Sequence, residues 1–157
     1  TESSTPPIFP LKLKVEINCR EHFHVLDYAR IPYSITNQWF SGKCNILTYQ
    51  LDELIGTKIR ALYERRKGRD LFDVYCALQD ERLNAYNVMH CFCSYMKHEG
   101  KQPNHSLYVA NMNEKLNNTE FLGDTINLLR PGTTFDPAES YILVKELLIN
   151  KLLKSPT

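Results

Sequence analysis

The residues from Leu51 to Leu78 limit the possible folds of this chain more than any other segment. Apolar residues recur there at intervals of three and four, which is the spacing of one face of a helix. These residues are Leu51, Leu54, Ile55, Ile59 and Leu62. We expect Gly68 to end the helix, because glycine adopts the left-handed backbone that often terminates helices. Asp70 can then cap a second helix, so the stretch predicts two helices joined by a sharp turn.

Two cations continue the apolar stripe of the first helix. Lys58 lies four residues after Leu54, and Arg65 lies three residues after Leu62. A charge on an inward face costs free energy unless it is paired or meets an anion. The turn brings three further charged residues to the same corner, Arg69, Asp70 and Asp73. The corner either braces two helices through an arginine–aspartate pair, or it holds phosphate groups on its lysine and arginine.

Strand-like patterns are confined to the first third of the chain. Residues Leu11 to Cys19 alternate apolar and polar side chains, which predicts a strand with Glu16 on its polar face. Shorter extended pieces are expected over 31–35, where Pro32 interrupts, and over 43–49. Helical spacing dominates the rest of the sequence. Helices are expected over 81–98, 107–116, 120–129 and 137–153, the last capped by Asp136 with Pro137 in its first turn.

These patterns predict an α+β fold that is predominantly helical. A strand-bearing segment, residues 1–49, would precede a helical domain, residues 50–157. The chain has 157 residues, of which 43% are hydrophobic and 24% charged, so it can bury a real core. The net charge of +1 neither indicates nor excludes nucleic acid binding. No apolar run reaches the ~20 residues that span a bilayer, and the odd, scattered cysteines favour reduced thiols in a cytosol.

A cluster of histidines and cysteines on the predicted helix 81–98 gives only a weak metal signal. Cys91 and Cys93 are two residues apart, so on a helix they point in divergent directions and cannot chelate one ion together. The six glycines are dispersed, and none forms a phosphate-binding loop.

The segment from Glu53 to Leu78 resembles the C-terminal signature of the AbiEii/AbiGii toxin family of nucleotidyltransferases. That signature is approximately K-x-x-A-L-x-x-R-x-x-x-R-D-x-x-D. The matching positions are Lys58, Ala61, Leu62, Arg65, Arg69, Asp70 and Asp73. The strand 11–19 is similar to the family strand that bears a third acidic residue, and residues 135–152 are similar to its final helix.

The resemblance implies a function and a role for each matching residue. A family member would transfer a nucleotidyl group from a nucleoside triphosphate, with Mg²⁺, to an acceptor such as RNA. It would be the toxin half of a cytoplasmic bacterial toxin–antitoxin or phage-defence pair. The implied roles are a metal ligand at Glu16, phosphate binding at Lys58 and Arg65, catalytic positions at Arg69 and Asp70, and bracing of the motif by Asp73.

One departure from the family pattern affects the expected activity. Such enzymes begin with a Gly-Gly or Gly-Ser helix start and a paired acidic motif on a strand, and this sequence contains neither. We therefore interpret the chain as the C-terminal part of a family member and expect it to be inactive in isolation. The alternative is a non-catalytic helical module that binds a partner protein or RNA. An unpaired strand edge recruits other strands, so a homodimer through residues 11–19 is also open.

Overall fold

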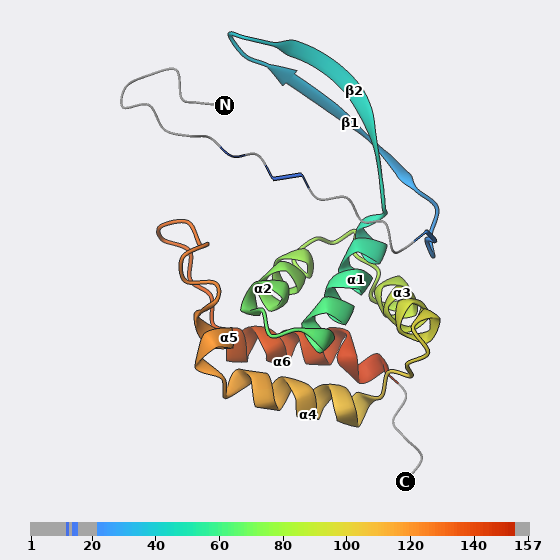
Figure 1. Cartoon of the computed structure of the whole chain (residues 1–157), viewed down its shortest axis with the longest axis vertical. Coiled ribbons are helices and arrows are strands. Elements are labelled where there is room, and N and C mark those ends of the chain that lie inside the picture. Colours follow the sequence, from blue (N-terminus) through green and yellow to red (C-terminus); the bar gives the residue numbers. More distant parts are fainter. Residues whose placement is uncertain (1–11, 13, 16–21, 153–157) are drawn as a thin grey trace.

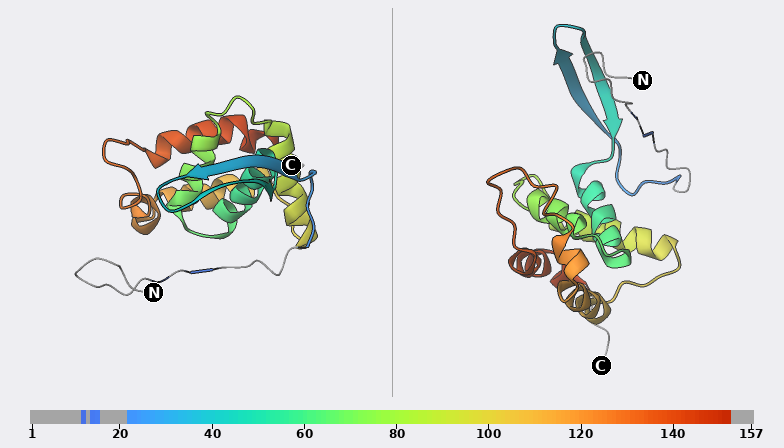
Figure 2. Two further views of the ribbon diagram at one scale, coloured as in Figure 1. Left: turned by 90° about the horizontal axis from the view of Figure 1, so that it is seen from above. Right: turned by 60° about the vertical axis from the view of Figure 1, so that its left-hand side comes forward.

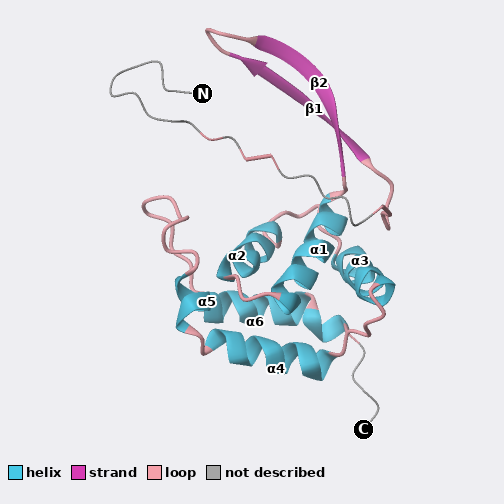
Figure 3. Ribbon diagram, in the orientation of Figure 1, coloured by secondary structure: helices cyan, strands magenta, loops and turns pink. Residues whose placement is uncertain are grey.

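A two-stranded hairpin projects from a body of helices in the computed structural model (Figure 1). The structure describes residues 12, 14–15 and 22–152. The strands are β1 (Ala29–Thr36) and β2 (Ser41–Thr48). The helices are α1 (Leu51–Glu64), α2 (Gly68–Ala77), α3 (Ala85–His98), α4 (His105–Leu116), α5 (Thr119–Gly123) and α6 (Pro137–Leu147), with a 3-10 turn η1 (Ile149–Lys151). This arrangement confirms the expected α+β, predominantly helical class (Figure 3).

The hairpin has one apolar and one polar face. The strands are antiparallel, with Ile31 opposite Ile46 and Tyr33 opposite Cys44 on the apolar side. Pro32 was expected to interrupt this region but lies within β1, because every strand of a two-stranded sheet is an edge strand that tolerates proline. The predicted strand over residues 11–19, including Glu16, lies outside the described residues except at positions 12, 14 and 15.

Four of the helices start at a side chain that caps them. Each cap accepts hydrogen bonds from backbone N–H groups of the first turn, which have no partner inside the helix. The capping residues are Asn84 for α3, Asn104 for α4, Asn118 for α5 and Asp136 for α6. The cap at Asp136 with Pro137 after it confirms the predicted start of the final helix.

Other predicted boundaries are wrong. The third helix starts at Ala85 rather than Glu81, because Asn84 caps it. The predicted helix 120–129 ends at Gly123, after which the chain forms turns with hydrogen bonds three residues apart. The final helix ends at Leu147 and continues only as the 3-10 turn. None of the helices within the described residues has the length and apolar composition needed to cross a membrane.

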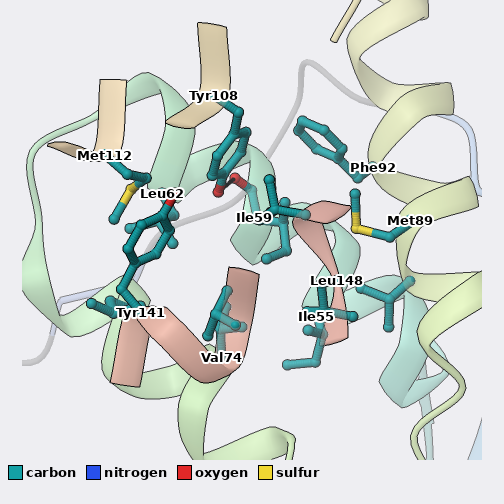
Figure 4. Packing of buried hydrophobic residues seen from close by; sticks show 14 of the residues in the cluster. Ile55, Ile59, Leu62, Val74, Met89, Phe92, Tyr108, Met112, Tyr141 and Leu148 are labelled. Carbon is teal, nitrogen blue, oxygen red and sulfur yellow. Dashed lines mark hydrogen bonds between the residues drawn. The ribbon is translucent and has the colours of Figure 1, made fainter. Parts of the chain in front are cut away.

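Helix α1 lies between α2 and α3 and contributes to the core on both sides (Figures 1 and 2). Ile59 and Leu62 are fully buried, and Ile55 is nearly so. They pack with side chains from the other helices, among them Val74, Phe92, Tyr108, Met112 and Leu148 (Figure 4). Gly56 allows α3 to approach closely, since a Cβ atom there would lie 2.7 Å from the Cβ of Cys91. Ile55, Ile59 and Leu62 of the predicted stripe thus form the centre of the core, whereas the prediction is wrong for Leu54, which is 39% exposed.

The first turn of α1 carries two buried carboxylates that tie other segments to it. Glu53 is fully buried and accepts hydrogen bonds from the Val25 and Leu26 backbone N–H groups at 2.8 and 2.9 Å. It also accepts one from the Tyr95 hydroxyl of α3, at 2.7 Å. Asp52 accepts from the backbone N–H of the α3 cap at 2.9 Å. These bonds hold α3 and the segment before the hairpin against the start of α1.

Candidate functional site

The end of α1 and the start of α2 bring together Lys58, Arg65, Asp70 and Asp73, which we call the α1–α2 corner. Arg65 follows the last helical residue, and its extended backbone (φ −126°, ψ 162°) leaves the helix. Its Nε and Nη2 groups donate to the two oxygens of Asp70, both at 2.7 Å. Such a two-point contact fixes the plane of the guanidinium.

Burial differs sharply between the two partners of this pair. Asp70 is fully buried, whereas the Arg65 side chain is 54% exposed. The hydrogen bonds that Arg65 donates to Asp70 raise the pKa of Arg65 above its already high value, although burial acts in the opposite direction. The prediction that Arg65 continues the inward stripe of the helix is therefore wrong. It lies beyond the helix and turns back to a buried carboxylate.

Asp70 does not cap the second helix as predicted. Helix α2 starts at Gly68, two residues earlier, and its N-cap residue Lys67 makes no side-chain cap. Gly68 does not have the left-handed backbone expected of a helix end. Instead, a Cβ atom at this position would lie 2.2 Å from the Phe121 carbonyl oxygen of α5. Close packing against α5 therefore requires a glycine at this position. Asp70 lies inside the helix and binds Arg65 instead of capping it.

Lys58 is paired and partly exposed, so the prediction that it faces inward from the helix stripe is wrong. Its Nζ donates to Asp73 Oδ2 at 2.6 Å and lies 3.6 Å from Asp70 Oδ1. The Lys58 and Asp73 side chains are 38% and 43% exposed. The corner therefore carries two cations and two carboxylates and has no net charge. Solvent, and hence a ligand, can reach Lys58, Arg65 and Asp73, while Asp70 is covered.

Arg69 belongs to a neighbouring ion-pair group. Its backbone N–H donates to Asp124 Oδ2 at 3.1 Å, and its Nε lies 3.7 Å from the same oxygen. Lys67 Nζ also lies near this aspartate, at 3.9 Å from Oδ1. The four predicted residues Lys58, Arg65, Asp70 and Asp73 thus come together, whereas Arg69 pairs with an aspartate just after α5 that sequence reasoning missed.

Two further residues, which sequence reasoning did not single out, bind the carbonyl groups at the end of α1. Lys115 of α4 is 3% exposed and donates to the carbonyl oxygens of Leu62 and, at 2.8 Å, Tyr63. The Tyr108 hydroxyl donates to the Ile59 carbonyl at 3.1 Å. Burial lowers the pKa of Lys115 to about 8. A signal existed, because Lys115 lies seven residues after Tyr108, on the same face of α4.

Residues 6–140 of the chain match the family model described as nucleotidyl transferase AbiEii toxin of type IV toxin–antitoxin systems. The chain belongs to the AbiEii family. The matched range includes the hairpin, the whole α1–α2 corner and Asp124. No curated protein and no solved structure matches the chain. Membership indicates a nucleotidyltransferase-like toxin. It also indicates, in general terms, an antitoxin as the partner, a nucleotide as the substrate and a divalent metal ion as the cofactor.

The described residues of the AbiEii chain do not fit such a metal ion. Among them, no three histidine, cysteine, aspartate or glutamate side chains gather in a way that could hold one. Asp70 and Asp73 already accept from Arg65 and Lys58. The predicted ligand Glu16 lies outside the described residues.

Proposed function

We propose that the α1–α2 corner holds the phosphates of a nucleoside triphosphate while a nucleotidyl group passes to an acceptor such as RNA. The observation that carries this proposal is the Arg65 guanidinium, which a fully buried Asp70 fixes beside a partly exposed Lys58. An arginine has five N–H donors, and Asp70 engages two of them. The remaining three can bind phosphate oxygens without any rearrangement of the pair.

The four corner residues would then have distinct roles. Arg65 acts as a planar fork and Lys58 as a mobile point charge, which is the division of labour expected at phosphate sites. Asp70 acts through Arg65 and fixes its orientation. Asp73 is the counter-ion of Lys58 at 2.6 Å, and an incoming phosphate would replace it. Arg69, the other position that the family resemblance marks as catalytic, would order the start of α2 through Asp124.

The remaining features of the proposal come from the family. The family resemblance gives Mg²⁺ as the cofactor and Glu16 as its ligand; Glu16 lies outside the described residues, and the roles proposed for the corner do not depend on a metal ion. The protein would act in the bacterial cytoplasm, in phage defence, together with a cognate antitoxin. A homodimer through an exposed strand edge is supported by the hairpin, because a two-stranded sheet leaves both outer edges without a strand among the described residues.

A second function is favoured by one observation. Lys58 is already paired with Asp73 at 2.6 Å, so the corner can serve as a brace without any ligand. The chain would then be a non-catalytic helical module that binds a partner protein or RNA. The two functions differ in whether a phosphate competes for Lys58.

Two lysine variants separate these functions. Lys58→Met keeps the length and apolar stem of the side chain and removes its charge. Lys67→Met is a matched control, because its side chain is also 38% exposed and it also faces two carboxylates. We expect Lys58→Met to weaken binding of a nucleoside triphosphate by about 1.5–3 kcal/mol, the loss of a charge-assisted hydrogen bond. Lys67→Met should leave it nearly unchanged.

The measurement is a calorimetric titration of the 157-residue chain beside a thermal melt of each variant. Binding is the readout, because the proposal concerns how the corner holds the phosphates of the triphosphate. If Lys58→Met melts far below the wild type yet binds triphosphate normally, Lys58 is a structural ion-pair partner and the phosphate assignment is wrong.

A further inference from the structure

A groove of about 520 Å³ lies along α3. Helix α3 lies on the opposite side of α1 from α2 (Figures 1 and 2). One wall is a single face of α3, and the other is formed by residues 101–103 and the end of η1. The lining residues from α3 are Tyr86, Met89, His90, Cys93 and Lys97, and Lys151 and Leu152 close the far side. The α1–α2 corner and this groove therefore occupy different faces of the helical body.

The rim of the groove carries cations that the described part of the chain leaves unneutralised. Lys97 and Lys151 are exposed, and neither has an ion-pair partner among the described residues. Lys101 is different, since it pairs with Glu64 and with Glu99, the latter at 2.6 Å. Two positive charges that have no ion-pair partner among the described residues thus line the groove from different elements, which suits an anionic ligand.

An exposed aromatic ring lies at the other end of the same helix face. Tyr86 is 76% exposed and is parallel to the His90 ring, with an interplanar angle of 3° and a centroid distance of 6.4 Å. An open ring supported on one side provides a surface on which a planar base can stack. The buried side chains Met89 and Leu152 supply an apolar floor between this ring and the lysines.

The length of the groove favours a strand over a single nucleotide. Tyr86 and Lys97 are eleven residues apart on α3, which corresponds to about 16 Å of helix. A stacked strand carries one phosphate charge per ~3.4 Å, so this distance covers several nucleotides.

We propose that this groove binds single-stranded nucleic acid, with one base stacked on Tyr86 and the backbone passing Lys97 and Lys151. Binding itself does not depend on the α1–α2 corner. That the bound strand is the acceptor of a transferred nucleotide rests on the function proposed above. A failure of strand binding and a failure of triphosphate binding are therefore separate results.

The test is fluorescence anisotropy of the 157-residue chain with a labelled eight-nucleotide RNA and its DNA counterpart, over a range of salt concentrations. Tyr86→Ala should raise the Kd between about fivefold and about a hundredfold, the range measured for loss of one stacked base. The double variant Lys97→Ala/Lys151→Ala should reduce the slope of log Kd against log salt by about 1.4, because each phosphate contact on a single strand contributes about 0.7. Comparable binding of both strands assigns the groove to nucleic acid in general, and tighter binding of RNA assigns it to RNA.

Lys43→Ala is the matched control, since this exposed lysine lies in β2 of the hairpin, which projects from the helical body and contributes no residue to the groove (Figure 1). Thermal melts establish that each variant folds, which the exposure of Tyr86, Lys97 and Lys151 favours. Poly-glutamate serves as an anionic peptide probe. The proposal is overturned if the groove variants bind RNA as the Lys43→Ala control does, or if poly-glutamate competes with RNA at equal charge concentration and Tyr86→Ala has no effect.

Discussion

Two fully buried carboxylates, Glu53 and Asp70, are satisfied in opposite ways. Glu53, in the first turn of α1, accepts from two backbone N–H groups and the Tyr95 hydroxyl, which are neutral donors. Asp70, in the first turn of α2, accepts from the Arg65 guanidinium and lies 3.6 Å from the Lys58 ammonium. Both carboxylates avoid the cost of a buried, unpaired charge.

The difference separates a structural anchor from a site that can meet a ligand. The donors to Glu53 are fixed in the fold, and Glu53 has no exposed surface through which a ligand could replace it. The cations around Asp70 are partly exposed and keep donors that Asp70 does not use. Burial of a carboxylate alone therefore does not mark a functional site. Exposed and charged partners, such as Arg65 and Lys58, are what would allow a ligand to bind beside one.

Of the variants that test this comparison, Glu53→Gln should have the largest effect on the free energy of unfolding. The amide group of glutamine would face a backbone N–H donor, so at least one charge-assisted hydrogen bond is lost and one donor is left unsatisfied. We expect the free energy of unfolding to fall by about 3–4 kcal/mol. Asp70→Asn should cost less, about 1–2 kcal/mol, because one oxygen still accepts from Arg65 and the freed guanidinium is half exposed to water.

Urea denaturation of both variants beside the wild type provides the measurement. Both substitutions are isosteric and remove one charge, so each serves as the control for the other. An Asp70→Asn variant that is less stable than Glu53→Gln would contradict the distinction drawn here, because the partly exposed pair would then be the stronger anchor.

The pH dependence of stability sharpens the comparison at the other end of α1. Lys115 is a buried cation whose pKa burial lowers from 10.5 to about 8. Between these values the unfolded chain binds more protons than the folded chain, so this lysine makes stability rise with pH in that window. The increase in the free energy of unfolding that is due to Lys115 should reach about 2 kcal/mol at pH 9.5 and be absent below pH 7.

Other buried groups act in the opposite direction and must be subtracted. Burial raises the pKa of Cys91 to about 12 and that of Tyr141 to about 12, and it raises the pKa of Tyr108 well above its usual value. Each of these groups lowers the free energy of unfolding as the pH rises above the pKa that the group has in the unfolded chain. The relevant quantity is the difference between the wild type and Lys115→Met in urea melts from pH 6.5 to 9.5. A constant difference across that range would show that Lys115 is not a buried charge.

The sequence was sufficient for the features that depend on local pattern. Helical spacing located α1 and its core face, the aspartate–proline pair located the start of α6, and the motif placed Lys58, Arg65, Asp70 and Asp73 in one corner. In each case the signal comes from neighbouring residues along the chain. Membership of the AbiEii family was also readable from the spacing of the motif.

Features that depend on packing between distant segments could not be read in this way. Gly68 is required because α5 lies against it, and no local pattern predicts the Phe121 carbonyl at that position. The three donors to Glu53 come from two segments far from it in sequence, so its burial had no local signal. The same holds for Asp124, which takes Arg69 away from the corner. The prediction that Lys58 faces inward failed because the spacing along α1 does not show Asp73 of α2, with which Lys58 pairs at the surface.

The smallest effect on stability is expected for Asp73→Asn, and it gives the most direct test of the phosphate proposal. The Lys58–Asp73 pair is about 40% exposed on each side, so removing its charge should change the free energy of unfolding by less than about 1 kcal/mol. If a phosphate replaces Asp73 at Lys58, this variant removes the competitor and should bind triphosphate more tightly than the wild type.

Asp80→Asn is a control, because Asp80 pairs with Arg82 at an exposed position outside the corner. Titration with inorganic triphosphate measures the effect without any contribution from a base. Weaker binding in Asp73→Asn would mean that this aspartate orients Lys58 for the ligand, and unchanged binding would mean that no phosphate reaches Lys58.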